Sequence, residues 1–243
     1  MSSETFKPYQ GSELGKKEQV AQMFDNISGK YDFLNHFFSL GIDKAWRKKT
    51  IKKIKSSGAQ NILDVATGTG DLAMAASKAG IPKTIGVDIS NGMLEVGREK
   101  VKKAGMSGSV ELKYGDSENM PFETDQFDAG MVAFGVRNFE NLNKGLTEMH
   151  RVIKPKGLIC VLEFSKPSMF PVKQVFWIYF KILMPVIGKF ISGDNRAYTY
   201  LPGSVDRFPY GKAFLDELEK VGFTDLAEKR LSGGIATLYT GLK

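Results

Sequence analysis

The sequence predicts an α/β fold built on a doubly wound, mostly parallel sheet, and three features carry that prediction. A short apolar run at residues 62–66 passes through a turn with Gly68 and Gly70 into helix-forming residues 72–77, which is the order strand, glycine turn, helix. Strand and helix patterns alternate along the rest of the chain. The length of 243 residues suits one such domain with a full core and an appended piece.

The alternation after the glycine turn gives the expected order of elements. Helices are expected at residues 92–104, 141–152 and 211–221, and strands at residues 83–88, 110–114, 127–134, 158–164, 226–231 and 236–242. Such alternation predicts parallel strands joined by right-handed crossovers. Gly233 and Gly234 join the last two strands, so we expect an antiparallel hairpin that closes the sheet.

The charges around the glycine turn distinguish between the ligands that such a turn binds. The spelling Gly-x-Gly-x-x-Ala from Gly68 fits the dinucleotide fingerprint and is by itself a weak signal. However, Asp64 precedes the glycines and Asp71 follows them, and two carboxylates would repel a diphosphate by roughly several tenths to a few kcal/mol. S-adenosylmethionine carries an ammonium and a sulfonium group and no phosphate. An acidic glycine turn therefore favours S-adenosylmethionine over a nicotinamide dinucleotide.

Two further acids stand where the next strands end. Asp88 ends the second strand, where a carboxylate accepts hydrogen bonds from both ribose hydroxyls. Asp116 follows the third strand, within Tyr114-Gly115-Asp116-Ser117, and can accept from an adenine amine. The structural alternative is that loop aspartates only cap three helices. That alternative does not predict that acids at three successive strand ends meet in one crevice.

Composition limits the compartment and the class of partner. A net charge of +7 and a pI of about 9.3 favour anionic partners, such as nucleic acid or a lipid surface. The single cysteine, Cys160, lies in an apolar run and is expected in the core of a protein from a reducing compartment. The polar N-terminus shows no signal-peptide pattern. We therefore expect a cytoplasmic protein.

The chain is expected to form one domain, residues 18–243, after a mobile tail at residues 1–17. Within the domain we expect N-terminal helices at residues 18–57 and an inserted helical lid at residues 168–205. The second N-terminal helix should begin with Asp43 as its N-cap and end near Lys55. Its many lysines form either a solvated face or a patch for phosphate head groups.

The expected lid has an unusual composition. Aromatic residues at 170–200 alternate with Lys173, Lys181, Lys189 and Arg196, and Pro185 interrupts an apolar stretch that is shorter than the ~20 residues of a membrane span. One interpretation is an interfacial helix at an anionic membrane. The other is an ordinary core helix of an inserted cap.

With these features in view, the sequence resembles the menaquinone and ubiquinone biosynthesis C-methyltransferases from about Val20 to the C-terminus. The glycine turn is general to class I methyltransferases, whereas several other segments are far more specific. The matching segments are Phe24-Asp25-Asn26-Ile27-Ser28, Tyr31-Asp32, Asn35, Ser39-Leu40-Gly41, Trp46-Arg47, residues 64–71, Phe134-Gly135-Val136-Arg137-Asn138, Arg151-Val152-Ile153-Lys154-Pro155, Leu162-Glu163-Phe164-Ser165-Lys166-Pro167, residues 198–204 and Phe208-Pro209.

The resemblance implies a class I S-adenosylmethionine-dependent methyltransferase with a Rossmann-like seven-stranded sheet whose last strand is antiparallel. It implies methyl transfer from S-adenosylmethionine to a ring carbon of a prenylated quinol, without a metal. The positions matching the cofactor site are Asp64, Gly68, Thr69, Gly70, Asp88, Asp116 and Ser117. Many relatives carry serine where this chain has Ala133, which puts one minor cofactor contact in doubt.

Arg137 and Asn138 are the candidate catalytic residues, since they follow the fourth strand beside the expected sulfonium. An aromatic carbon attacks a methyl sulfonium only when it is electron-rich, so the substrate must be the reduced quinol. Arginine is a poor proton acceptor, and we expect Arg137 to stabilise the developing phenolate, with a water as a candidate base. The alternative is that Arg137 forms an ion pair that fixes the loop. His36 is a second candidate base, and His150 is expected on an exposed helix face.

Several alternatives stay open at this point. The substrate is demethylmenaquinol, the polyprenyl-methoxy-benzoquinol of ubiquinone biosynthesis, or both. A basic nucleic-acid methyltransferase is the rival class, although no Asn-Pro-Pro-Tyr-like site follows the fourth strand and no nucleic-acid partner is expected. A nicotinamide enzyme and a non-catalytic binding module are further rivals. The expected partner surface is the inner face of the cell membrane. The sequence does not determine the oligomeric state, and a homodimer stays open.

Overall fold

The computed structural model describes residues 6–9, 11–179 and 195–243. These residues form one seven-stranded sheet in the order β3-β2-β1-β4-β5-β7-β6. The strands are β1 (Asn61–Val65), β2 (Lys83–Asp88), β3 (Val110–Tyr114), β4 (Phe127–Ala133), β5 (Ile153–Phe164), β6 (Thr224–Leu231) and β7 (Ala236–Leu242). The first five are parallel, and β7 runs antiparallel to both β5 and β6. The expected doubly wound sheet with an antiparallel last strand is confirmed.

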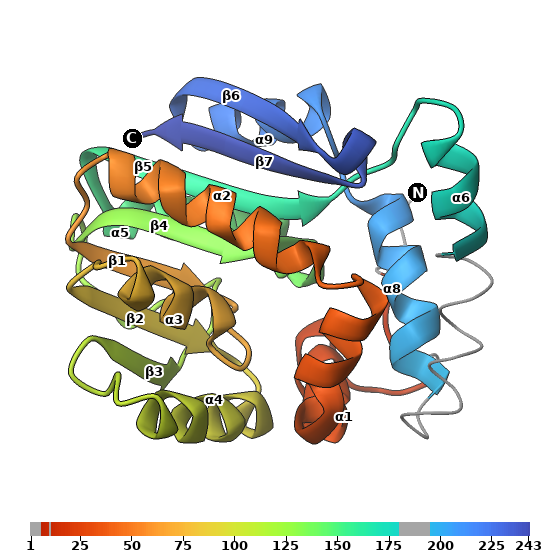
Figure 1. The fold of residues 1–243 in the computed structure, drawn as a ribbon, viewed down its shortest axis with the longest axis horizontal. Helices are drawn as coiled ribbons and strands as arrows, with labels where there is room; N and C mark the ends of the chain where they lie inside the picture. Colours follow the sequence, from red (N-terminus) through yellow and green to blue (C-terminus); the bar gives the residue numbers. More distant parts are fainter. Residues whose placement is uncertain (1–5, 10, 180–194) are drawn as a thin grey trace.

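Helices cover both faces of this sheet (Figure 1). On one face lie α2 (Ile42–Ser56) and α3 (Asp71–Lys78), and on the other lie α5 (Leu142–Val152) and α9 (Lys212–Lys220). Neighbouring residues of β1 point to opposite faces, since Ile62 packs in the core under α2 and Leu63 in the core under α5. The helix α4 (Asn91–Lys103) packs along β3 at the edge of the sheet.

A third layer lies beyond the carboxyl ends of the parallel strands (Figure 1). It contains α1 (Lys16–Phe38), α6 (Val172–Ile178) and α8 (Asn195–Arg207). A separate core holds it together, in which Val20 and Met23 of α1 pack with Tyr200 and Val205 of α8. The helix α6 lies within the segment expected to form a lid, and α8 begins in that segment and ends two residues beyond it. Residues 180–194, which include Lys181, Pro185 and Lys189, lie outside the described residues.

The N-terminal helices differ from expectation at their starts. Gly41, with a φ of 72°, precedes α2, and Asp43 lies inside the first turn rather than capping it. Asp43 is buried and accepts a hydrogen bond from the Ser39 hydroxyl at 2.6 Å, so tertiary contacts use the carboxylate that was expected to cap the helix. The first helix begins at Lys16, inside the segment expected to be a tail. Residues 6–9 and 11–15 are described, and Tyr9 N–H donates to the Gln19 side chain at 2.8 Å.

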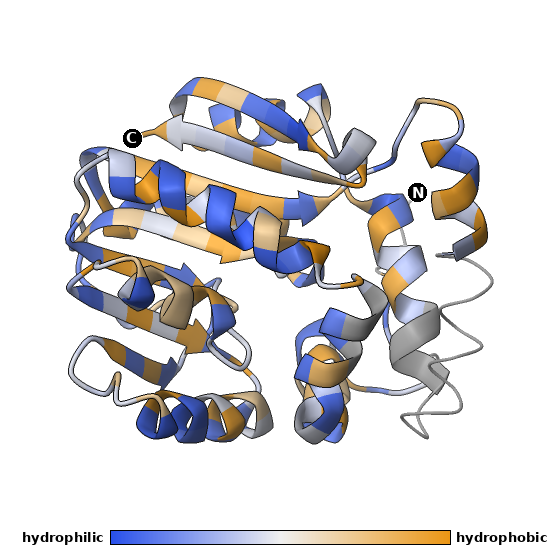
Figure 2. Cartoon of the chain, in the orientation of Figure 1, coloured by the Kyte–Doolittle hydropathy of each residue, from blue (hydrophilic) through white to orange (hydrophobic). Residues whose placement is uncertain are grey.

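Hydropathy follows this architecture (Figure 2). The outer side of α2 is largely hydrophilic, because Lys44, Lys48, Lys49, Lys52, Lys53 and Lys55 are all exposed. Cys160 is fully buried in β5, as expected. No helix in the described part of the chain combines the length and the hydropathy that a membrane crossing needs.

Candidate active site

Two adjoining cavities lie between the carboxyl ends of the strands and the third layer of helices. The larger has a volume of about 390 Å³ and lies among α1, α6, α8 and the end of β5. The smaller, of about 70 Å³, lies beside the glycine turn that follows β1. Four residues line both cavities, namely Phe24, Tyr31, Phe134 and Asn138. A ligand in one cavity can therefore touch a ligand in the other.

The smaller cavity has an open glycine backbone and carboxylates on its walls. Gly68 has a φ of 57°, and a Cβ at this position would meet no other atom within 4 Å, so the backbone is accessible to a ligand. The Asp88 carboxylate accepts the Gly68 N–H at 2.8 Å and the Ser90 N–H at 2.9 Å, which ties the end of β2 to the glycine turn. Asp116 lines the same cavity and pairs with Lys17 at 2.6 Å.

Four of the seven expected cofactor residues line the smaller cavity, and the other three lie outside its lining. Gly68, Asp88, Asp116 and Ser117 line the smaller cavity, together with Ala133, the position where many relatives carry serine. Asp64, Thr69 and Gly70 are not part of that lining.

The three residues outside the lining belong to the glycine turn or to the strand before it, and their contacts hold this turn in place. Asp64 is buried and accepts the Thr67 hydroxyl at 2.6 Å, and burial raises the pKa of Asp64 to about 7. The Thr69 hydroxyl donates to Asp32 of α1 and accepts from Lys100 of α4. Gly70, at a φ of 79°, precedes the first turn of α3.

The two histidines lie outside both cavity linings. His36 lies between two carboxylates, with Nδ1 3.0 Å from Asp43 and Nε2 3.5 Å from Asp71. It is thus part of a polar network that joins α1 and α2 to the glycine turn. His150 is half-buried against the Phe223 ring, at 5.0 Å between centroids, rather than exposed.

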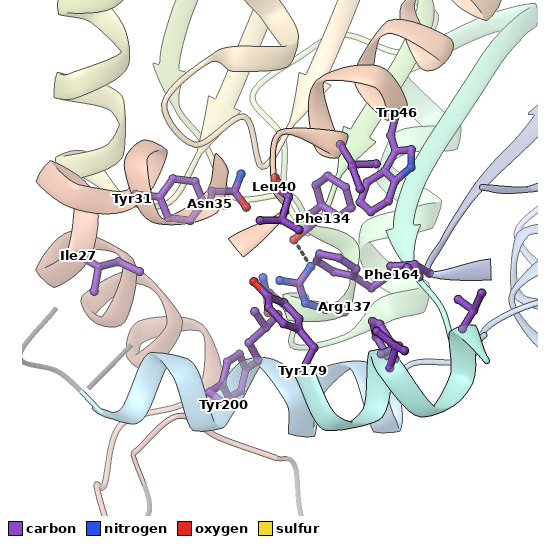
Figure 3. Close-up of a pocket in the computed structure, with 18 of the residues that line it drawn as sticks. Ile27, Tyr31, Asn35, Leu40, Trp46, Phe134, Arg137, Phe164, Tyr179 and Tyr200 are labelled. Carbon is purple, nitrogen blue, oxygen red and sulfur yellow. Dashed lines mark hydrogen bonds between the residues drawn. The ribbon is translucent and has the colours of Figure 1, made fainter. Parts of the chain in front are cut away.

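The larger cavity is mainly apolar, with a few buried polar atoms on its walls. Four of these atoms have no hydrogen-bond partner among the described residues: Asn35 Nδ2, Arg137 Nε, Asn138 Oδ1 and Tyr200 Oη. Figure 3 shows Asn35 and Tyr200 on opposite sides of the cavity with Arg137 between them. Because an unpaired buried polar group costs about 1 to 3 kcal/mol, a ligand that supplied partners to these four atoms would be favoured in this otherwise apolar cavity.

Contacts with Phe134 and Glu163 fix the position of the Arg137 side chain. It lies in a short 3-10 helix, η1 (Val136–Asn138), and its guanidinium pairs with Glu163 at 2.8 Å and donates to the Phe134 carbonyl. Glu163 is fully buried, and desolvation raises its pKa while Arg137 opposes that rise. The guanidinium also lies 5.6 Å from the centre of the Phe164 ring. The ion pair considered as an alternative is therefore present, and it coexists with a free Nε at the cavity wall.

Sequence reasoning did not select Asn35 and Tyr200 of this cavity, nor Glu163, which pairs with Arg137 and is not part of the lining. Glu163 had a usable signal, since it is a lone charge within the apolar residues 158–164 of a buried strand. Asn35 and Tyr200 lie on helices separated by most of the chain, and no local pattern brings them together. Within the described residues, no group of three His, Cys, Asp or Glu side chains is arranged to bind a metal ion.

Comparison with known proteins agrees with this geometry. The model of the ubiE/COQ5 methyltransferase family matches residues 13–243. The chain belongs to this family. It is similar to the Demethylmenaquinone methyltransferase of Bacteroides fragilis, with 51% identity over 99% of this chain and 98% of the relative. The Porphyromonas gingivalis protein of the same name is 41% identical over 100% of this chain and 99% of the relative.

A third relative carries a broader name. The Ubiquinone/menaquinone biosynthesis C-methyltransferase UbiE of Geobacter sp. strain M21 is 44% identical over 94% of this chain and 97% of its own length. The family resemblance is thereby confirmed, and the chain is an S-adenosylmethionine-dependent methyltransferase.

Solved structures support the fold. An S-adenosylmethionine-dependent methyltransferase from Thermotoga maritima superposes with a TM-score of 0.64 at 19% identity, covering 92% of this chain and 99% of that one. Another from Aquifex aeolicus gives 0.56 at 20% identity, covering 79% and 88%. The class I methyltransferase fold is confirmed.

Proposed function

We propose that this methyltransferase transfers a methyl group from S-adenosylmethionine to a ring carbon of demethylmenaquinol, giving menaquinol. The observation that carries the proposal is the pair of adjoining cavities, one with an acidic glycine turn and one apolar, that share Asn138 and three aromatic residues. Two relatives named Demethylmenaquinone methyltransferase, at 51% and 41% identity, support the choice of quinol. The Geobacter relative's name keeps the benzoquinol of ubiquinone biosynthesis as the alternative substrate.

The walls of the smaller cavity carry groups that suit the methyl donor. Gly68 leaves its backbone open, Asp88 retains lone pairs for the ribose hydroxyls, and Asp116, which lines the same cavity, is the proposed acceptor for the adenine amine. Ser117 lies beside Asp116 in the same wall. Asp64, Thr69 and Gly70 lie outside the cavity lining and hold the glycine turn in its conformation. When bound, S-adenosylmethionine supplies an electrophilic methyl group.

The larger cavity fits a prenylated quinol. Its apolar walls exclude water from the reacting ring, and its unpaired polar atoms match a ring that carries hydroxyl groups. Arg137 Nε donates to the hydroxyl oxygen next to the reacting carbon and stabilises the negative charge that develops there. Asn138, which lines both cavities, holds the same hydroxyl against the methyl donor. As the ring carbon attacks the methyl group, the methyl–sulfur bond breaks and S-adenosylhomocysteine is released. The hydroxyl proton leaves to a water, because the guanidinium does not accept it. Loss of the proton on the methylated ring carbon and reprotonation of the oxygen then restore the aromatic quinol.

An assay with both demethylated quinols, each in the reduced and the oxidised form, tests this proposal. We expect turnover of reduced demethylmenaquinol and none of either quinone, since a quinone carbon is not nucleophilic. Comparable turnover of the reduced benzoquinol would extend the function to ubiquinone biosynthesis. Methylation of RNA or DNA without turnover of any quinol would contradict the proposal and support the nucleic-acid alternative.

We also propose that the protein is cytoplasmic and docks at the inner face of the cell membrane to reach its substrate. The residues that both line the larger cavity and are exposed mark its mouth, and they are apolar: Leu40 is 77% exposed and Val175 is 64% exposed. Exposed lysines of α2 follow Leu40 in the chain and suit anionic head groups. A mouth of this kind leaves the prenyl tail in the lipid while the ring enters the cavity.

A further inference from the structure

Tyr200 of α8 is, with Asn35, one of two unpaired polar groups of the larger cavity that the proposed reaction does not use. Its side chain is buried, at 4% exposure, and its Oη has no hydrogen-bond partner among the described residues. Tyr200 lines the larger cavity and not the smaller one. A buried phenol hydroxyl without a partner is costly unless a ligand supplies one.

The N-terminal segment fixes the Tyr200 ring. Phe6 stacks on it with 5.3 Å between ring centroids and 5° between ring planes. The Arg207 guanidinium lies over the Phe6 ring, 4.1 Å from its centre. Gly203, one turn after Tyr200, makes room for Phe6, because a Cβ there would overlap the Phe6 ring. The phenol is therefore held in one orientation before a substrate arrives.

The chemistry of the quinol indicates what this hydroxyl meets. Demethylmenaquinol carries one hydroxyl beside the reacting carbon and a second across the ring, beside the carbon that bears the prenyl chain. Asn138 lies where the two cavities join, so the first hydroxyl belongs there and the second faces the part of the larger cavity that the methyl donor does not reach. We propose that the Tyr200 hydroxyl binds this second hydroxyl and that Phe6 is its positioning residue.

The properties of the phenol agree with this role. Burial raises the pKa of Tyr200 to about 12, so its hydroxyl stays protonated and both donates and accepts a hydrogen bond. A quinol hydroxyl also does both, whereas a quinone carbonyl only accepts. The inference rests on the proposed quinol substrate and adds a second polar anchor for the doubly hydroxylated ring.

The test compares two ligands that differ only in the second hydroxyl: a short-chain demethylmenaquinol and the corresponding prenylated 1-naphthol. Their dissociation constants without methyl donor, and kcat/KM with it, are measured for the parent, for Tyr200→Phe and for the control Tyr210→Phe. Phe keeps the stacked ring at position 200 and removes only Oη, and Tyr210 is outside both cavity linings. We expect Tyr200→Phe to weaken quinol binding and kcat/KM about tenfold and to change both by less than twofold for the naphthol.

An equal change for both ligands, or no change for either, would overturn the inference. A parent that neither binds nor methylates the quinol would overturn the proposed function itself, and the two failures are thereby distinguishable. Phe6→Leu tests the positioning role. It should reproduce part of the hydroxyl-dependent loss in the parent background and add nothing in the Tyr200→Phe background. Full additivity of the two changes would show that Phe6 does not act through Tyr200.

Discussion

Arg137 combines a structural ion pair with the proposed catalytic role. Its bonds to Glu163 and to the Phe134 carbonyl use one end of the guanidinium, and Nε remains at the cavity wall. A lysine offers a single point charge and cannot satisfy Glu163 and the cavity at once. The role of Arg137 therefore depends on the shape of the guanidinium as well as on its charge.

Arg137→Lys should leave the dissociation constant of S-adenosylmethionine within about twofold and lower kcat by about ten- to a hundredfold. Arg151→Lys is the matched control, because Arg151 also pairs with a carboxylate, Glu148 at 2.7 Å, but lies outside both cavity linings. Calorimetric binding and steady-state turnover measure the two effects. Turnover within twofold of the parent would exclude the transition-state role.

Asp88→Ala should weaken binding of S-adenosylmethionine by about ten- to a hundredfold, the loss of charge-assisted bonds worth roughly 1.5 to 3 kcal/mol. Asp128→Ala controls for the backbone contacts that both changes remove. Asp128 accepts the Gln60 and Asn61 N–H groups at 2.9 Å each, yet lies outside both cavity linings. Equilibrium binding and thermal unfolding separate affinity from stability. Unchanged affinity in Asp88→Ala would remove this carboxylate from the cofactor site.

Asp64 makes stability depend on pH. Its pKa of about 7 in the folded state lies above the usual value of 3.8, so the folded state binds the proton more tightly than the unfolded state does. Its contribution to stability is then lost as the pH rises from about 4 to about 7, and is constant above that range. Asp64→Asn removes this dependence, since a neutral side chain stays in the same place.

The free energy of unfolding of Asp64→Asn, relative to the parent, should therefore rise between about pH 5 and pH 7 by as much as a few kcal/mol and stay level above pH 7. Denaturant titrations at each pH measure it. Asp128→Asn should show no such trend, because its Lys154 and backbone hydrogen bonds lower the pKa of Asp128 and place its dependence at more acidic pH. A flat difference for Asp64→Asn would mean that Asp64 is ionised in the folded protein.

At the scale of elements, the turn between α1 and α2 and the helix α6 form the mouth of the larger cavity. Leu40 in the turn and Val175 on α6 both line the cavity while remaining mostly exposed. Their exposure allows a charge to be introduced without burying it, so the fold should survive the change. These two positions therefore separate membrane docking from catalysis.

Leu40→Glu combined with Val175→Glu should lower sedimentation with anionic liposomes at low salt, and should reduce turnover of a long-chain quinol more than that of a short-chain quinol. Leu14→Glu is the control, as Leu14 is 45% exposed and outside the cavity lining. Equal losses on both quinols, or no liposome binding by the parent, would contradict membrane entry through this mouth.

The elements also show what local pattern can and cannot predict. The strand at residues 110–114 was predicted with the bounds it has, because apolar residues and turns bracket it clearly. The start of α2 was wrong, since Asp43 has the composition of a cap but its carboxylate is engaged by His36, Ser39 and Arg47. Local pattern predicts an element when its own residues decide it, and fails where a distant side chain competes.

At the scale of the molecule, the sheet places the acids of the smaller cavity and the helices of the third layer enclose the larger cavity. Asp88 and Asp116 could be predicted because parallel strands end at one edge, so position along the strand suffices. Asn35 and Tyr200 could not be predicted, because they line the same cavity only through the way α1 and α8 pack in a separate core. An ion pair of Arg137 was expected as an alternative, but its partner was not. The partner is Glu163, which is close because Arg137 follows β4 and Glu163 lies in the neighbouring strand β5.

The central claim is that the two cavities bring a ring carbon of a reduced quinol to the methyl donor. A single turnover with ¹³C-methyl-labelled S-adenosylmethionine and reduced demethylmenaquinol tests it most directly, with the product examined by carbon NMR. We expect one labelled methyl bonded to the ring carbon next to the hydroxyl. A label found on a hydroxyl oxygen, or no label in the quinol, would contradict it.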